Sequence, residues 1–203
     1  MGPMHLKNLA ETLSSGDQQD LLRLATDSIE RGLKGTQLEV DLAACSRALR
    51  GPGASFVTIN VRDQLRGCIG SLEIKRALAV DVVKNARAAA FDDPRFGALT
   101  QVEFENLHIH ISVLSSPEII DCASEDELLR QLRPGIDGVI LEDGTSRATY
   151  LPSVWEVLPD PHNFLQQLKC KAGLSLDHWS ETMKVQRYTT ECMSYRVSSK
   201  KCR

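Results

Sequence analysis

The first part of the chain carries its apolar residues at helical spacing. Between Asp17 and Gly32 they recur every three or four positions, at Leu21, Leu24, Ala25 and Ile29. This spacing is typical of an amphipathic helix that packs one face on a core. Ser15 or Asp17 can cap the start of this helix, and Gly32 with Gly35 can end it.

The next pattern is an alternation of apolar and polar residues, which is typical of strands. Residues 54–61, ASFVTINV, alternate in this way, and a turn at 62–64 lets residues 65–69 pair back as a second strand. Residues 107–114, LHIHISVL, alternate almost perfectly, and residues 118–121 can add a short strand. We therefore expect an antiparallel sheet in the first half of the chain.

Helical segments lie between and after these strands. A short helix is expected over residues 41–50, and a second, alanine-rich one over residues 77–91, which ends before Pro94 because proline disfavours helical backbone at the preceding residue. Residues 124–132 begin with a capping-box pattern, a serine followed three residues later by a glutamate.

The second half of the chain mixes a hairpin with further helices. Residues 138–141 and 147–151 flank an Asp-Gly pair, which predicts a β-hairpin. Pro152 opens one helical stretch, residues 161–173 form another, and residues 184–197 read as a final strand. Hairpin-linked strands with unevenly placed helices predict an α+β fold, a mainly antiparallel sheet with flanking helices, and disfavour a Rossmann repeat.

Composition places the chain among ordinary globular proteins. It has 203 residues, of which 42% are apolar and 25% charged, which excludes disordered, collagen-like and coiled-coil classes. The length is sufficient to bury a substantial core. We expect one domain over residues 17–197, after an N-terminal extension at 1–16 and before a tail at 198–203.

Charge and cysteine usage limit the partners and the compartment. The net charge is −3, so no general attraction to nucleic acid or to an anionic membrane is expected. No apolar run approaches the ~20 residues of a membrane helix, and the N-terminus lacks the features of a signal peptide. The six cysteines are scattered without a CxxC pair: Cys45, Cys68, Cys122, Cys170, Cys192 and Cys202. We interpret them as reduced thiols of a cytoplasmic protein that holds no metal and no cofactor.

The segment LRGCIG, residues 65–70, is the most distinctive chemical feature. Glycines let a ligand approach the backbone closely, consecutive amides can bind an anion, and a nearby helix start favours a thiolate at Cys68. Arg66 could hold a carboxylate or phosphate. The commoner explanation for such a cysteine is a buried thiol in a tight turn.

Other candidates each have a structural alternative. Asp93 or Arg95 could face a ligand, or the two could pair to hold a turn, which is the commoner use. His108 and His110 share one face of a strand and could begin a metal site, but no third ligand can be assigned. A solvent-facing polar row is the favoured interpretation of this pair.

Four further positions are interpreted as structural. His162 and His178 are expected to be packing or surface residues. The lysines at 169 and 171 suit the negative end of a helix dipole and require no ligand.

The segment LRGCIG is also the landmark by which the chain resembles the AMMECR domain family, also called AmmeMemoRadiSam system protein A. The resemblance runs from about Leu21 to Tyr188 and rests on landmarks in order: FVTI (56–59), LRGCIGSL (65–72), DPRF (93–96), ISVLSSP (111–117), DGVILEDG (137–144), ATYLPSVW (148–155) and FLQQLKCKAGL (164–174). It implies a larger and a smaller subdomain with a cleft between them. It also implies an association with a Memo-like protein and a radical SAM enzyme.

Two functional hypotheses follow, and a third is disfavoured. The favoured one is a non-catalytic binding or adaptor subunit, whose cleft at LRGCIG recognises the Memo-like protein, the radical SAM enzyme or a small anionic ligand. The alternative is an enzyme with Cys68 as nucleophile or ligand-contacting thiol, Arg66 as anion clamp and the amides of residues 67–70 (Gly67, Ile69 and Gly70 included) as an oxyanion cradle. Asp93 and Arg95 would support that site. A nucleic-acid-associated regulatory role is the third hypothesis.

Overall fold

The computed structural model describes residues 13–197, which divide into two compact units. The first unit comprises Met1–Leu114 and Glu191–Arg203, and the second comprises Ser115–Thr190. Each unit has its own sheet and its own apolar core. Residues 1–12 of the predicted N-terminal extension (1–16) and the predicted tail at 198–203, including Cys202, lie outside the described residues.

The sheet of the first unit has four antiparallel strands in the order β10-β5-β2-β3. Their bounds are β2 Ser55–Val61, β3 Gln64–Gly70, β5 Leu107–Leu114 and β10 Thr190–Arg196. A separate two-stranded antiparallel sheet consists of β1 (Pro52–Gly53) and β4 (Arg76–Ala77). The strand that carries LRGCIG is therefore an edge strand.

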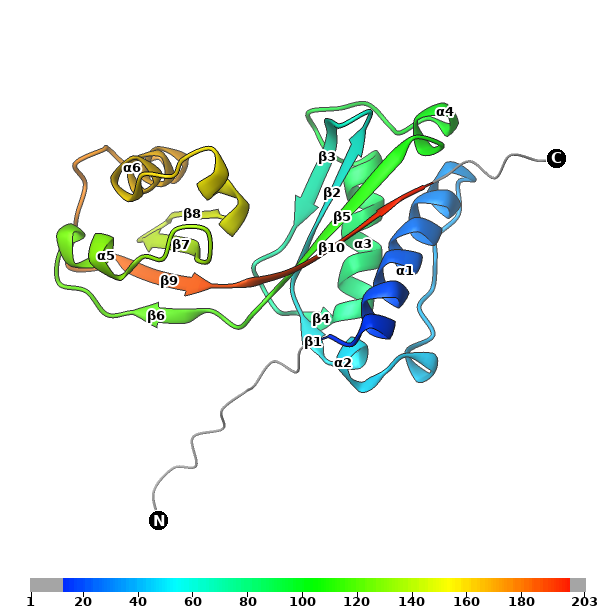
Figure 1. Ribbon diagram of the computed structural model, residues 1–203, viewed down its shortest axis with the longest axis horizontal. Helices are drawn as coiled ribbons and strands as arrows, with labels where there is room; N and C mark the ends of the chain where they lie inside the picture. The colour runs from blue at the N-terminus through cyan, green and yellow to red at the C-terminus, as the bar shows by residue number, and fades with distance from the viewer. Residues whose placement is uncertain (1–12, 198–203) are drawn as a thin grey trace, which may run out of the picture. The chain divides into compact units, whose positions relative to one another are not determined.

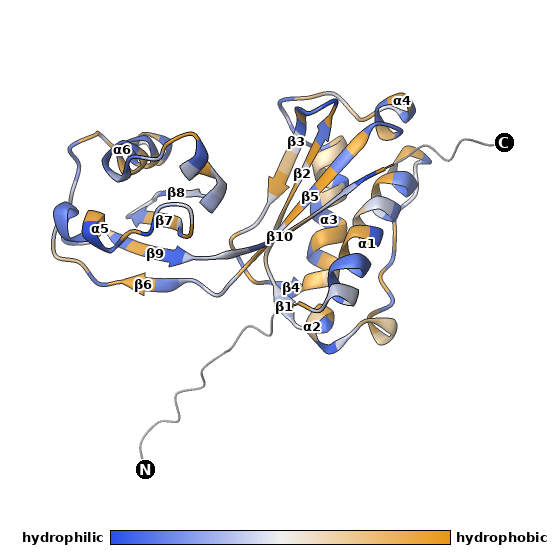
Figure 2. Cartoon of the chain, viewed as in Figure 1, coloured by the Kyte–Doolittle hydropathy of each residue, from blue (hydrophilic) through white to orange (hydrophobic). Residues whose placement is uncertain are grey.

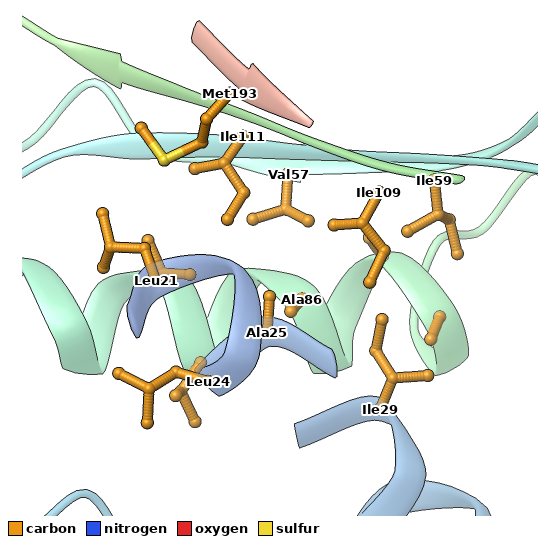
Figure 3. Packing of buried hydrophobic residues seen from close by; sticks show 14 of the residues in the cluster. Leu21, Leu24, Ala25, Ile29, Val57, Ile59, Ala86, Ile109, Ile111 and Met193 are labelled. Atoms are coloured by element: carbon orange, nitrogen blue, oxygen red, sulfur yellow. The ribbon is translucent and has the colours of Figure 1, made fainter. Parts of the chain in front are cut away.

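Helices α1 (Ser15–Leu33) and α3 (Leu78–Phe91) cover one face of this sheet (Figure 1). The 3₁₀ helix Leu42–Ala44, α2 (Arg47–Arg50) and α4 (Gln101–Phe104) are short connectors. Alternation decides which strand residues are buried, and Figure 2 shows the corresponding bands of apolar and polar residues along β5. Figure 3 shows the result: apolar side chains of β2, β5 and β10 point at the helices, among them Val57, Ile109 and Met193. Among residues 13–114 and 191–197, no helix lies on the opposite face of the sheet.

A buried carboxylate joins α3 to the sheet. Asp81 is fully buried, and its Oδ2 accepts hydrogen bonds from the amide and the hydroxyl of Ser55 at 2.9 and 2.7 Å. Burial raises the pKa of Asp81. This contact fixes the start of β2 against the helix and so sets the position of the whole strand.

The second unit repeats the principle on a smaller scale. Its antiparallel sheet has the order β6-β9-β7-β8, with β6 Glu118–Ile120, β7 Gly138–Asp143, β8 Ser146–Tyr150 and β9 Lys184–Tyr188. Its helices are α5 Glu125–Gln131, the 3₁₀ helix Pro152–Glu156 and α6 Pro161–Lys171. Trp155 and Phe164 stack in its core with ring centroids 3.7 Å apart.

These elements confirm the predicted α+β class, and four local predictions need correction. Ser14, and neither Ser15 nor Asp17, caps α1. Its hydroxyl accepts from the amide of Asp17, and the Asp17 carboxylate accepts from the amide of Ser14. Residues 41–50 form two separate short helices. In the segment 124–132, Ser124 caps the helix as expected, because its side chain accepts from the amide of Glu127. The capping box is not closed, since the Glu127 carboxylate accepts from the amide of Ala123 and not from that of Ser124.

The fourth correction concerns the last predicted strand. Residues 184–197 do not form one element, because the chain leaves the second sheet after Tyr188 and enters the first sheet at Thr190. Periodicity alone cannot locate this change, since both halves are strands.

Candidate functional site

The LRGCIG segment is β3, the strand at one edge of the first sheet. It pairs with β2 through a hairpin whose two turn residues, Arg62 and Asp63, have φ of 52° and 63°. The register shifts by one residue between Ile59 and Asn60, which leaves Arg66 without a partner position on β2. This bulge turns the arginine out of the regular ladder.

The predicted pair Asp93 and Arg95 occupies the free edge of β3. The amide of Cys68 donates to Asp93 Oδ2 at 2.9 Å, and Arg95 Nη2 donates to the Cys68 carbonyl at 3.3 Å. Arg95 also bonds the Asp93 carboxylate through Nε at 3.0 Å and Nη2 at 2.7 Å. The hydrogen bonds from Arg95 hold the pKa of Asp93 well below its usual range. The loop thus takes the place of a neighbouring strand.

Arg66 is bound by groups of its own unit. Its Nε donates to Glu103 Oε1 at 2.7 Å, and its Nη2 donates to the carbonyls of Gly97 and Ala98 at 2.9 and 3.2 Å. The arginine lowers the pKa of Glu103 to about 2. Only 14% of the Arg66 side chain is exposed. Its Nε and Nη2, two of the donors expected to clamp an anion, already hold a helix start and a loop, while its Nη1 is buried without a hydrogen-bond partner among the described residues.

The two glycines of the motif allow close packing. A Cβ on Gly67 would lie 2.0 Å from the carbonyl oxygen of Ala89 in α3, and one on Gly70 would lie 2.3 Å from Cγ of Phe56. Ile69 packs against the core of the first unit. The sequence suggested that these glycines let a ligand approach the backbone. In the structure they let helix α3 and the ring of Phe56 approach it instead.

The thiol of Cys68 lies on the helix-free face of the sheet. Thr58 Oγ1 donates to Cys68 Sγ at 3.2 Å, and Thr58 is in turn the register partner of His110 on β5. Cys68, Thr58 and His110 therefore form a row across three adjacent strands. All three residues are partly exposed.

The row continues to His108, the neighbour of His110 on the same face of β5. His110 Nε2 and His108 Nδ1 are 3.1 Å apart, within hydrogen-bond distance. Burial lowers the pKa of both imidazoles, and the neighbouring His108 lowers that of His110 further. The polar row expected from the sequence is present.

Thr58 and Glu103 are the participants that the sequence analysis missed. Thr58 is one of the polar residues that alternate with apolar ones along β2, so it lies on the face opposite the core. Once β2 is paired with β3, this alternation places Thr58 beside Cys68. Glu103 forms a capping box with Thr100, whose amide donates to Glu103 Oε2 at 2.8 Å. The capping box can be predicted from the sequence, but it does not indicate that Glu103 also binds Arg66.

The remaining candidates lie in the second unit and do not join this site. His178 Nε2 is 2.6 Å from Asp143 Oδ2, which also accepts from the hydroxyl of Ser180 at 2.8 Å. His162 lies at the start of α6 and lines a pocket of about 470 Å³. Lys169 is fully buried and donates to Glu125 Oε2 at 2.6 Å. Lys169 lies in the last turn of α6, as expected, and is in addition bound to a carboxylate.

The remaining features of residues 13–197 concern metal ligands, membrane spans and thiols. Within this range no three or more His, Cys, Asp or Glu side chains are grouped so that they could hold a metal ion. No helix in the same range is both long and apolar enough to cross a membrane. Cys45, Cys68, Cys122 and Cys170 are free thiols.

Comparison with known proteins finds matches over most of the chain. A protein of Thermofilum pendens is 34% identical over 195 residues, which cover 88% of this chain and 90% of the relative. A protein of Methanococcus aeolicus is 34% identical, with 93% and 95% covered. The crystal structure of the uncharacterized protein PH0010 from Pyrococcus horikoshii superimposes with a TM-score of 0.83 at 34% identity, covering 90% of this chain and 93% of that one. The AMMECR1 family model matches residues 22–193, so the chain belongs to the AMMECR1 family.

Proposed function

We propose that this protein is a non-catalytic binding subunit that acts with a Memo-like protein and a radical SAM enzyme. The observation that carries this proposal is how LRGCIG is used. The Nε and Nη2 of its arginine, its glycines and the amide of Cys68 are all engaged within the first unit. An oxyanion cradle needs amides and a cation that are available to the substrate. A motif used in this way favours recognition over catalysis.

Exposed apolar side chains beside the motif offer a contact surface. A hollow of about 340 Å³ lies next to Arg66, and its lining includes Leu65 and Val102. These two side chains are exposed by 46% and 69%, respectively. Apolar side chains that border a concave surface are typical anchor points for a protein partner. We assign the partner surface to this hollow.

The test is co-purification of the full chain with the Memo-like protein and the radical SAM enzyme of the same organism. The substitution Val102→Glu places a charge in the proposed surface, and Val157→Glu is the matched control, because Val157 is 80% exposed and lies in the second unit. We expect Val102→Glu to weaken complex formation by about tenfold or more, the effect of a hot-spot residue.

Two results would contradict the proposal. If neither purified partner binds the wild-type chain at micromolar concentrations, the adaptor function in its protein-binding form is wrong. If the two glutamate variants weaken binding equally, the partner binds elsewhere. Circular dichroism of both variants separates loss of binding from loss of folding.

The second candidate function is an enzyme that uses Cys68 as its nucleophile or ligand-contacting thiol. The position of the thiol favours it, because Cys68 is partly exposed on the helix-free face of the sheet and the hydrogen bond from Thr58 Oγ1 to Cys68 Sγ orients the sulfur. Limiting iodoacetamide between pH 5 and 9 compares Cys68 with the exposed Cys170. Faster labelling of Cys68 with a midpoint well below ~8.5 supports the enzyme. Labelling of Cys68 only after denaturation excludes it.

A further inference from the structure

The histidine pair on β5 has no assigned role in the proposed partner surface. His108 and His110 lie on the helix-free face of the first sheet, and both are partly exposed. The strand is an interior one, held by β2 on one side and β10 on the other. The backbone therefore holds the two imidazoles at a fixed separation, as a preformed ligand pair requires.

The separation of the two ring nitrogens suits a shared metal ion. His110 Nε2 and His108 Nδ1 are 3.1 Å apart, and the ring centroids are 3.9 Å apart. An ion at the usual metal–imidazole distance of about 2.0–2.1 Å from both nitrogens would subtend an angle of about 100° between them. This angle lies between the octahedral and tetrahedral values, so the separation of the two nitrogens is compatible with a chelate.

The neighbouring residues leave this position accessible. The register partners of His108 and His110 on β2 are Asn60 and Thr58, which carry neutral oxygen-bearing side chains. The nearby cation, Arg196 of β10, is 2.8 Å from the Asp63 carboxylate, which offsets part of its repulsion of a bound metal.

We propose that His108 and His110 form a two-imidazole chelate for a divalent transition metal. Imidazole nitrogen selects Cu²⁺, Ni²⁺ or Zn²⁺ over Mg²⁺ and Ca²⁺, which take oxygen ligands. The absence of a third His, Cys, Asp or Glu ligand within residues 13–197 leaves the other coordination positions to water or to an added ligand. This site lies outside the chemistry of the proposed partner function and stands independently of it.

The experiment is a calorimetric titration of the full chain with Ni²⁺, which does not oxidise the cysteine thiols. The variants His108→Gln and His110→Gln each remove one ligand, and His162→Gln, on α6 of the second unit, is the matched control. His5→Gln tests the N-terminal histidine. Thermal unfolding of every variant confirms that the fold is kept. NMR spectra of the imidazole nitrogens, recorded with diamagnetic Zn²⁺ in place of paramagnetic Ni²⁺, identify the rings that respond to the metal.

We expect one Ni²⁺ per chain and a loss of about 100-fold in affinity on removing either member of the pair, since the second contact of a chelate is intramolecular. The resonances of these two rings alone should shift, and His162→Gln should bind as the wild type does. The proposal is wrong if the wild type binds no more tightly than a double variant that carries both His108→Gln and His110→Gln. It is equally wrong if binding survives both substitutions and is abolished by His5→Gln or by blocking the thiols.

Discussion

The substitution Gly67→Ala tests whether β3 depends on direct contact with helix α3. The added Cβ would lie 2.0 Å from the Ala89 carbonyl oxygen and 2.9 Å from its carbonyl carbon. Both atoms belong to the helix backbone, so no side-chain rotation can relieve the overlap, and the strand and helix must separate. Overpacking of a tight interface costs about 1–3 kcal/mol. Because backbone moves against backbone here, we expect a loss at the upper end of this range.

The matched control is Gly97→Ala, where an added Cβ meets nothing within 4 Å. We expect the control to change the free energy of unfolding by less than about 0.5 kcal/mol. In a chain of this length, 3 kcal/mol corresponds to a decrease in the melting temperature of roughly 6–12 °C. Circular dichroism at 222 nm measures it for both variants.

Tryptophan fluorescence adds the location of the effect. Both tryptophans of the chain, Trp155 and Trp179, lie in the second unit. If the two units unfold independently, Gly67→Ala shifts the circular dichroism transition and leaves the fluorescence transition unchanged. A melting temperature within about 2 °C of the Gly97→Ala control would refute the packing argument, since it would mean a cost below 1 kcal/mol.

Two further predictions concern carboxylates whose pKa is lowered. The pKa of Asp93 is depressed in the folded state, so its stabilising contribution is present above an unfolded pKa of about 3.9 and is lost as pH falls further. Thermal unfolding between pH 6 and 3 should therefore decline less steeply in Asp93→Asn than in the wild type, and equal slopes would contradict this. Asp143, with a pKa lowered to about 2 by Thr182, His178 and Ser180, holds the loop that carries Trp179. Asp143→Asn should shift the Trp179 emission to longer wavelength at pH 7, as acid does in the wild type toward pH 2, and an unchanged spectrum would show that this carboxylate does not fix the loop.

Strands were the most predictable part of this fold. The segment LHIHISVL was expected to be a strand at 107–114, and it is β5. Its apolar residues face the helices and its polar residues face the opposite side, so the alternation in the sequence predicts the strand directly. The limits of helices were harder to predict, since a cap is chosen by hydrogen bonds that several neighbouring polar residues could make. Ser14 caps α1 because Asp17 is placed to return its bond, and sequence spacing fits several such pairs.

The chemistry of LRGCIG could be predicted only in part. The sequence identified the residues that meet at β3, and Asp93 and Arg95 do contact Cys68. It could not show that Arg66 is bound by Glu103, which is 37 positions further along the chain. Long-range partners of this kind depend on topology, which local pattern does not specify.

The route of the chain between the two sheets has a consequence for folding. Strands β5 and β10 lie side by side in the first sheet, although the whole second unit, Ser115–Thr190, separates them in sequence. During synthesis the ribosome therefore delivers β2, β3 and β5 long before the strand that completes them. Until β10 arrives, one edge of β5 is unpaired and the place of Met193 in the core is empty. The nascent first unit depends on the timely folding of its own insertion, so a slow step in the second unit prolongs the exposure of an edge strand in the first.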